Sequence, residues 1–205
     1  MSIKAGVVGA AGFAGIEAVR LLAAHPSFEL SAITSSELAG TRLADVYPAF
    51  EGVSDLRFLA HDDSALDECD VVFLAVPHTA ALKAAPGFIE RGISVIDLSA
   101  DFRLKDPAVY EKWYKVPHTQ TELLSQAAFG LPELMGDELA AVAARRAKGE
   151  AVLVACAGCY PTATSLAAAP AVRAGFVREG SPIVVDAVSG VTGAGRSEER
   201  RVGKE

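Results

Sequence analysis

Short apolar runs that alternate with stretches of helical periodicity constrain the fold of this chain more than any other feature of its sequence. The apolar runs predict strands over 3–8, 28–34, 71–76, 93–98, 152–156 and 183–188. The periodic stretches predict helices over 12–24, 80–91 and 161–174. Strands that alternate with helices indicate an α/β fold, in which helices cover both faces of a parallel sheet and ligands bind at the carboxyl ends of its strands. The segment 104–126 lacks clean periodicity, and we expect a long surface excursion there.

The composition limits the class of protein. Hydrophobic residues make up 51% of the 205 residues and the net charge is −7, so we expect a buried core and neither intrinsic disorder nor a nucleic-acid partner. The uncharged run 151–172 is long enough to cross a bilayer, but its glycine and two prolines favour a strand, a turn and a helix, and we expect no membrane partner. Three sparse cysteines indicate a cytoplasmic protein with no disulfide framework and no structural zinc site.

A glycine-rich segment joins the first predicted strand to the first predicted helix. Gly9, Gly12 and Gly15 have the spacing GxxGxxG, in which one glycine allows a sharp turn and another lets the backbone meet a pyrophosphate at the helix N-terminus. This context predicts a dinucleotide site in a Rossmann-type sheet, while the alternative is a glycine-rich turn that only packs the helix on the sheet. The predicted cofactor-binding residues of this segment are Gly9, Ala11, Gly12, Phe13, Ala14 and Gly15.

The end of the second predicted strand selects the cofactor. An acidic residue there binds the ribose hydroxyls of NAD, whereas this chain has Thr34, Ser35 and Ser36. Hydroxyl groups can hydrogen-bond a 2′-phosphate, and Arg42 is placed to reach it, so NADP is the predicted cofactor. Glu37 argues in the other direction, because its carboxylate would repel that phosphate.

Cys159 lies between a predicted strand and a predicted helix. A thiolate at a helix N-terminus is stabilised by the helix dipole and by free N–H groups, and the same groups can form an oxyanion hole. The local sequence leaves three interpretations open: a small core cysteine, a redox pair with Cys156 in a C-x-x-C spacing, and a catalytic nucleophile.

Six segments are far more specific together than any one of them is alone. They are 9–15 (GAAGFAG), 75–78 (AVPH), 97–103 (DLSADFR), 129–134 (FGLPEL), 158–162 (GCYPT) and 189–196 (SGVTGAGR). With these segments in order, residues 1–196 resemble the N-acetyl-gamma-glutamyl-phosphate reductase family. The family usually reads Asn-Pro-Gly-Cys at its nucleophile, whereas this chain has Cys156 in place of the asparagine and so lacks that amide.

The resemblance implies a reductase of arginine biosynthesis. In the related enzymes a thiolate, here that of Cys159, attacks the acyl phosphate and expels phosphate, and NADPH reduces the thioester to N-acetylglutamate 5-semialdehyde. The resemblance also implies a homo-oligomer and a base histidine beyond the last segment, and no histidine follows His118 here. Pro77 and His78 are implied to lie at the cofactor. The residues implied to bind substrate are Arg103, Ser189, Gly190, Thr192 and Gly193.

Some of these residues have a second interpretation. Arg103 can instead pair with Asp97 or Asp101, and His78 can cap the following helix. The glycine-rich segment 189–193 can be a plain flexible turn. His61 and His118 are predicted to be loop residues, and no histidine of this chain is assigned as the base. No metal is expected.

The resemblance predicts the domain organisation as well. Residues 1–158 are expected to form the NADP-binding domain, 159–196 to begin an α+β catalytic and dimerisation domain, and 197–205 to be a non-native tail. Residues 196–205 show an abrupt rise in charge and match one reading frame of a common sequencing adapter. We therefore expect a truncated chain that retains a nucleotide site but does not turn over substrate.

Three other functions stay open at this point. Aspartate-semialdehyde dehydrogenase shares the fold and the cysteine chemistry, although the segments GCYPT and DFR argue against it. A non-catalytic NADP-binding module predicts an unreactive Cys159. A dithiol redox protein predicts reversible oxidation of Cys156 and Cys159.

Overall fold

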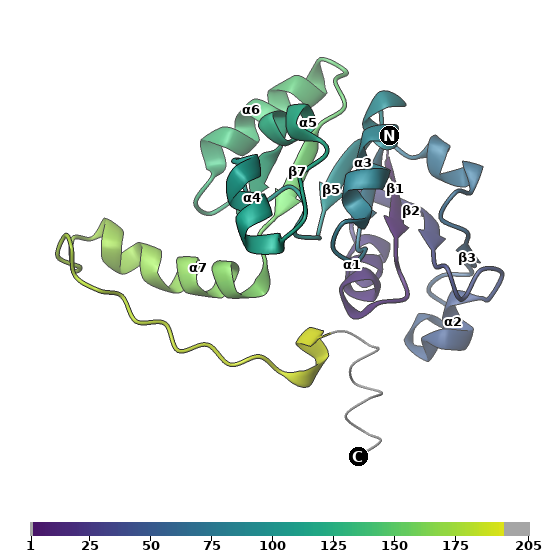
Figure 1. Ribbon diagram of the computed structural model, residues 1–205. Coiled ribbons are helices and arrows are strands. Elements are labelled where there is room, and N and C mark those ends of the chain that lie inside the picture. Colours follow the sequence, from purple (N-terminus) through teal and green to yellow (C-terminus); the bar gives the residue numbers. More distant parts are fainter. Residues whose placement is uncertain (1, 195–205) are drawn as a thin grey trace.

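The computed structural model describes residues 2–194, and its centre is a seven-stranded sheet (Figure 1). All strand pairs in this sheet are parallel. The spatial order is β3-β2-β1-β4-β5-β7-β6. The strands are β1 (Ile3–Val8), β2 (Phe28–Thr34), β3 (Phe58–Leu59), β4 (Val71–Leu74), β5 (Ser94–Asp97), β6 (Ala128–Gly130) and β7 (Leu153–Cys156).

The strand order reverses direction beside β1. The chain first adds β2 and β3 on one side of β1 and then returns to add β4 on its other side. At such a reversal the loops that follow the two neighbouring strands leave in different directions and open a crevice at the carboxyl edge of the sheet. The fold therefore places a ligand site where β1 and β4 end.

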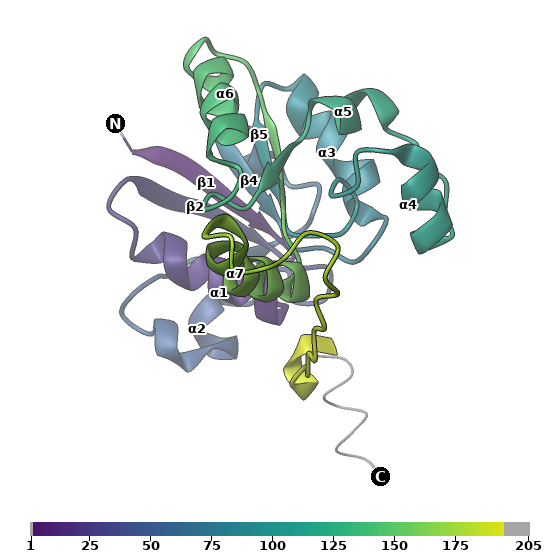
Figure 2. The ribbon, with the colours of Figure 1, turned by 90° about the vertical axis from the view of Figure 1, so that its left-hand side faces the viewer.

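Two hydrophobic clusters cover the two faces of the sheet. Because side chains alternate along a strand, Val7 packs in the cluster with Leu22 of α1, while Val8 packs in the other cluster with Phe88 of α3. Figure 2 shows α1 and α2 on one side of the sheet and α3, α4 and α5 on the other. The helices are α1 (Phe13–Ala23), α2 (Leu43–Val46), α3 (Ala80–Glu90), α4 (Pro107–Tyr114), α5 (Thr121–Gln126), α6 (Gly136–Ala147) and α7 (Cys159–Arg173).

The predicted strands and helices within residues 1–158 are confirmed, with boundaries that differ by a few residues. The prediction of a surface excursion over 104–126 was wrong. This segment contains α4 and α5, and Tyr110 and Leu124 of these helices are fully buried. Their helices are too short to show a clear period, so the sequence pattern gave no signal.

The chain beyond β7 differs most from the prediction. Helix α7 begins at Cys159, two residues before its predicted start. Pro161 is tolerated in the first turn because the residues there need no N–H group for an intrahelical hydrogen bond. The predicted strand over 183–188 is wrong: this segment pairs with no strand among the described residues, and Val184 is 89% exposed. In Figure 1, α7 and the chain that follows it project away from the sheet. The predicted tail, 197–205, lies outside the described residues.

Helices long and apolar enough to span a bilayer are not found within residues 2–194. The uncharged run 151–172 is divided between β7, a two-residue turn and α7, as its glycine and prolines predict.

Candidate active site

The loop between β1 and α1 lines a cavity of about 450 Å³ at the carboxyl edge of the sheet. The loop that follows β4 and the residues that follow β2 form the other walls. The lining residues are Gly9, Ala11, Gly12, Ser35, Ser36, Glu37, Leu38, His61, Ala75, Val76 and Pro77. The cavity therefore lies at the strand-order reversal, where the fold predicts a ligand.

The three glycines of this loop serve different purposes. Gly9 has a positive φ of 84°, and a Cβ there would lie 2.3 Å from the Ala75 carbonyl oxygen. A Cβ on Gly15 would lie 2.3 Å from the Gly9 carbonyl oxygen, so Gly15 lets α1 pack closely on the loop. Gly12 is different, because the nearest atom to its Cβ would be 3.7 Å away. The fold itself leaves room for a side chain at Gly12, which is one of the residues that line the cavity.

The N-terminus of α1 suits an anion. Gly12 is the N-cap, with no side-chain cap and no acidic residue in the first turn. The backbone N–H groups that open a helix lack intrahelical partners and carry the positive end of the helix dipole. These features fit a pyrophosphate lying against the glycine loop.

The end of β2 forms the second wall of the cavity. Ser36 and Glu37 are exposed there, and Ser35 lies beside them. Thr34 is fully buried behind them, where its hydroxyl oxygen accepts a hydrogen bond from the Gly9 N–H and lies 2.6 Å from Nδ1 of His61.

Arg42 does not reach the cavity, which corrects the expectation from the sequence. Its guanidinium lies 2.8 Å from the Glu51 carboxylate and 3.2 Å from that of Asp55. Hydrogen bonding to Glu51 raises the pKa of Arg42. The two carboxylates hold the guanidinium outside the lining of the cavity.

The structure brings together about half of the predicted cofactor residues. Gly9, Ala11, Gly12, Ser35, Ser36 and Pro77 line the cavity, whereas Phe13, Ala14, Gly15, Thr34 and His78 do not. Gly15 and Thr34 support the wall from behind, through close packing and a hydrogen bond respectively. His78 turns away toward a buried carboxylate.

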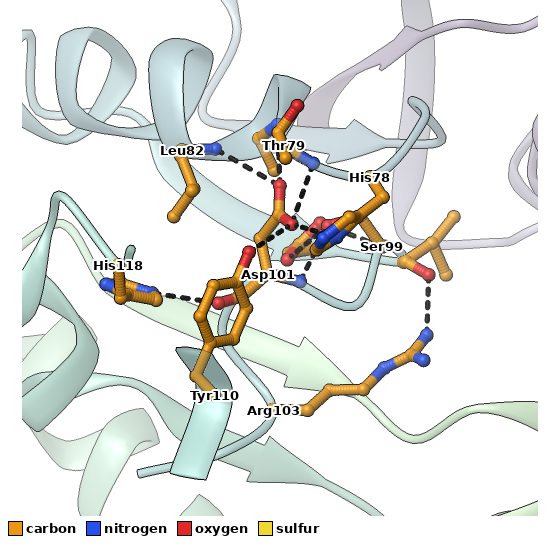
Figure 3. A network of polar contacts seen from close by, with 11 residues as sticks. His78, Thr79, Leu82, Ser99, Asp101, Arg103, Tyr110 and His118 are labelled. Atoms are coloured by element: carbon orange, nitrogen blue, oxygen red, sulfur yellow. Dashed lines mark hydrogen bonds and ion pairs between the residues drawn. The ribbon is translucent and has the colours of Figure 1, made fainter. Parts of the chain in front are cut away.

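That carboxylate belongs to Asp101, the centre of a polar network at the start of α3 (Figure 3). Asp101 is fully buried and accepts hydrogen bonds from the backbone N–H groups of Thr79, Ala81 and Leu82. Asp101 thus caps α3, although the N–H groups that it binds lie 19 to 22 residues earlier in the chain. The N-cap residue itself, Thr79, makes no side-chain cap and has a positive φ of 72°.

Aromatic side chains complete the network around Asp101. The Tyr110 hydroxyl donates to Oδ1 at 3.2 Å, and His78 places Nδ1 2.7 Å from the same oxygen. The imidazole of His78 also lies against the ring of Tyr114, 4.7 Å between centroids. His118 bonds the Asp101 carbonyl oxygen through Nε2. Burial raises the pKa of Tyr110 and lowers that of His118, so both side chains are neutral partners near neutral pH.

Cys159 lines a second cavity, which has a volume of about 540 Å³. It is the first residue of α7, it is exposed, and its thiol is free. The helix N-cap is Gly158, which makes no side-chain cap. Four of the residues predicted to bind substrate line the same cavity as Cys159: Ser189, Gly190, Thr192 and Gly193.

Arg103 supports the turn that carries Cys159. Its Nε donates to the Cys156 carbonyl oxygen at 2.8 Å. Its Nη2 donates to the Leu98 carbonyl oxygen, also at 2.8 Å (Figure 3). A Cβ on Gly158 would lie 2.9 Å from Nη1, so the guanidinium lies against the residue before Cys159. Arg103 makes no ion pair within 4.0 Å among the described residues, which excludes the predicted direct pairs with Asp97 and Asp101 in this structure.

Two further ionisable groups lie near this turn, the fully buried Asp97 and the half-buried Cys156. Burial raises the pKa of Asp97 to about 6, although Ser99 donates two hydrogen bonds to its carboxylate. Burial, with the Asp97 charge as a second cause, raises the pKa of the Cys156 thiol. Cys156 and Cys159 therefore differ in environment, since only Cys159 is exposed.

Sequence reasoning missed two histidines with structural partners. Both lie in loops, as predicted, but His61 lines the first cavity, and His118 is buried and bonds the Asp101 carbonyl oxygen. Neither position carries a periodic signal. The position of His61 just after a short strand is the one feature that could have placed it at the carboxyl edge of the sheet.

Comparison with known proteins decides the family. Residues 4–142 match the NAD binding domain of semialdehyde dehydrogenase, and residues 159–203 match the dimerisation domain of semialdehyde dehydrogenase. The chain belongs to the semialdehyde dehydrogenase family. Within this family, the first cavity lies in the NAD binding domain, while Cys159 is the first residue matched to the dimerisation domain.

Several curated relatives of this semialdehyde dehydrogenase chain are named N-acetyl-gamma-glutamyl-phosphate reductase. An N-acetyl-gamma-glutamyl-phosphate reductase of Neisseria gonorrhoeae (strain NCCP11945) is 48% identical over 194 residues, which cover 95% of this chain and 53% of the relative. An N-acetyl-gamma-glutamyl-phosphate reductase of Janthinobacterium sp. (strain Marseille) is 48% identical over 197 residues, which cover 96% and 54%. The chain thus spans about half the length of the curated relatives it matches.

Solved structures of semialdehyde dehydrogenases share the fold. The aspartate semialdehyde dehydrogenase II of Vibrio cholerae has a TM-score of 0.68 at 16% identity, covering 99% of this chain and 51% of that one. The aspartate semialdehyde dehydrogenase of Candida albicans, solved with NADP, has a TM-score of 0.62 at 23% identity, covering 85% and 48%.

Proposed function

We propose that this chain carries the nucleotide site and the nucleophile of an NADPH-dependent reductase that converts N-acetyl-gamma-glutamyl phosphate to N-acetylglutamate 5-semialdehyde and phosphate, a step in arginine biosynthesis. The names and identities of the curated relatives support the substrate. The observation that carries the proposal is the exposed Cys159 at the start of α7, in one cavity with Ser189, Gly190 and Gly193.

The residues at the first cavity fit a dinucleotide. The unfilled room at Gly12, the uncapped N-terminus of α1 and the hydroxyls of Ser35 and Ser36 suit a pyrophosphate and a phosphorylated ribose. When bound, NADPH supplies the hydride for the reduction. Residues 1–158 would hold it, with Pro77 on the side of the cavity toward His78.

Cys159 would act as a covalent catalyst. Its sulfur attacks the acyl carbon, the carbon–oxygen bond to phosphate breaks, and a thioester remains. Backbone N–H groups in the first turn of α7 can donate hydrogen bonds to the carbonyl oxygen and so stabilise its developing negative charge. After reduction, the bond between Sγ and the carbon breaks, the semialdehyde leaves and the thiolate is restored.

Arg103 would serve this chemistry in two ways. Two of its nitrogens fix the backbone before Cys159, and Nη1 is left beside Gly158, where it can meet a substrate oxygen. Cys156 stands where the related family has asparagine, so oxyanion stabilisation depends on the backbone and on residues 189–193.

The wider assembly belongs to the same proposal. The match to a dimerisation domain supports a homo-oligomer of the longer protein, with residues 159–196 contributing to the catalytic and dimerisation part. Its partner molecule is a small acyl phosphate, and the cytoplasm, where such pathway intermediates are made and used, is the proposed compartment.

A chimera tests the proposed function. Residues 1–194 of this chain would be joined to the corresponding C-terminal part of the Neisseria gonorrhoeae relative, which matches over 194 residues. We expect phosphate-dependent oxidation of N-acetylglutamate 5-semialdehyde with NADP⁺, and none with aspartate semialdehyde. The Cys159→Ser chimera should be inactive. Equal activity on aspartate semialdehyde would favour the other enzyme of this fold instead.

A further inference from the structure

We infer that His61 recognises the 2′-phosphate of NADPH, and that its protonation makes the preference for NADPH over NADH depend on pH. This inference rests on the nucleotide site proposed above. His61 follows β3 and lies beside the end of β2, the position that selects between the two cofactors in this kind of sheet.

His61 provides the basic group of this cavity. Among the described residues that line it, His61 alone can carry a positive charge. Arg42, the residue that the sequence suggested for this role, is held by Glu51 and Asp55. A phosphate between Ser35, Ser36 and His61 would therefore meet two hydroxyls and one imidazole.

The contact with Thr34 orients the imidazole. Thr34 is fully buried, and its hydroxyl oxygen lies 2.6 Å from Nδ1 and accepts from the Gly9 N–H. When His61 is neutral with its proton on Nε2, the threonine hydroxyl donates to Nδ1. When His61 is charged, Nδ1–H donates to the threonine oxygen, and Nε2 again carries a proton. Nε2 is a donor in both of these forms, as a phosphate oxygen requires.

The charges around His61 make its protonated form favourable for binding the 2′-phosphate. Glu37 is the one other ionisable side chain lining the cavity, and Asp62 and Asp63 follow His61 in the chain. The walls formed by the loops after β1 and β4 contribute no charged side chain. A charged His61 offsets the Glu37 carboxylate and attracts the phosphate dianion. Protonation and phosphate binding therefore favour each other, and NADH, which lacks this phosphate, gains nothing from the charge.

The test is a binding titration with the 205-residue chain, its His61→Gln variant and a His25→Gln control. Glutamine keeps an N–H donor but cannot be charged. The imidazole of His25 accepts a hydrogen bond from the Ser27 N–H and packs on Phe28, and it does not line the cavity. Nicotinamide fluorescence would report binding of NADPH and of NADH at about pH 6 and about pH 8, on either side of the usual histidine range.

The readout is the ratio of the Kd of His61→Gln to that of the original chain at the same pH. This ratio removes the protonation of the phosphate itself, whose pKa near 6 affects both proteins equally. For NADPH we expect a ratio of about ten near pH 6 and about two or less near pH 8, as a charge-assisted hydrogen bond is replaced by a neutral one. For NADH, and for His25→Gln, the ratio should stay near one.

Two other results have distinct meanings. If NADPH binds and its ratio is the same at both pH values, His61 does not recognise the phosphate by charge and the inference is wrong, while the nucleotide site stands. If neither nucleotide binds to any of the three proteins, the nucleotide site proposed above is wrong and the inference fails with it.

Discussion

At the scale of single residues, exposure and burial separate side chains of the same type. The three cysteines are buried, half-buried and exposed in the order Cys69, Cys156 and Cys159. Burial is the main cause that raises the pKa of Cys69, and the nearby Asp70 carboxylate adds to it. Chemistry at sulfur requires an accessible thiolate, so the environment selects Cys159.

We therefore expect Cys159 to be alkylated at least about ten times faster than Cys156 or Cys69 near neutral pH. Limited iodoacetamide treatment followed by peptide mapping would give the three rates. The Cys159→Ser chain is the control, in which the fast phase should vanish. Preferential labelling of Cys69 would show that the helix N-terminus does not activate the thiol.

Asp97 predicts how stability depends on pH. Its folded pKa of about 6 lies above the value of about 3.9 for an unfolded aspartate. The folded state therefore binds this proton more tightly, so the contribution of Asp97 to stability is greatest below about pH 4 and is lost as the pH rises through about 6. Between these limits, the free energy of unfolding should fall by about 2 kcal/mol relative to the Asp97→Asn chain. Urea unfolding of both chains across this range would measure the difference, and parallel pH profiles would contradict the assignment.

At the scale of secondary-structure elements, the start of α3 depends on a residue far along the chain. Asp101 satisfies three N–H groups there while it also receives Tyr110 and His78. The loop it holds continues into Pro77 and Val76, which line the first cavity. The cap and the cavity wall are therefore one structure.

Asp101→Asn should destabilise the chain by about 3 kcal/mol, because an amide NH₂ would replace one acceptor of a buried, fully bonded carboxylate. Asp106→Asn is the matched control. Asp106 caps α4 through one exposed hydrogen bond to the Ala108 N–H, and asparagine caps equally well, so a change within about 0.5 kcal/mol is expected. Chemical denaturation of the two variants compares them directly. Similar losses would mean that Asp101 is no more than an ordinary cap.

Some secondary-structure elements could be predicted from the sequence and others could not. β1, α1, β2 and α3 were predictable because each combines a clear apolar pattern with a boundary of glycine, proline or polar residues. β6 has three residues, too few to show a period, so it escaped prediction. The segment 183–188 is apolar like a strand but has no strand beside it, and a sequence pattern cannot show whether a partner is present.

The candidate site was predictable in part for the same reason. Gly9, Gly12 and Cys159 were found because they stand at strand-to-helix junctions, which the pattern locates. The roles of Arg42, Arg103 and His61 depend on which groups folding brings near them, such as Glu51 for Arg42 and Thr34 for His61. Contacts of this kind join distant parts of the chain and leave no local trace.

At the scale of the whole molecule, the described chain divides into a packed sheet domain and an exposed C-terminal part. α7 contains no buried residue. The exposed large hydrophobic side chains of this part are Tyr160, Val172, Phe176, Ile183, Val184, Val185 and Val188. Such a group of exposed apolar residues marks an interaction surface or promotes aggregation.

The 205-residue chain should accordingly bind a hydrophobic dye such as ANS and self-associate at micromolar concentration. The Val184→Lys, Val188→Lys double variant should reduce dye fluorescence by about half or more, because these two side chains are the most exposed of the group. NADPH binding should not change, since neither residue lines the first cavity. Dye binding that is unaffected by the substitutions would place the apolar surface elsewhere.

The central claim is that Cys159 forms a thioester with an acyl phosphate, and covalent trapping tests it most directly. The chimera described above would be incubated with N-acetyl-gamma-glutamyl phosphate without NADPH, digested, and analysed by mass spectrometry. We predict that the acyl group is attached to the peptide containing Cys159 and is lost when NADPH is added. An acyl group on Cys156 or Cys69 alone, or turnover that survives Cys159→Ser, would contradict the account.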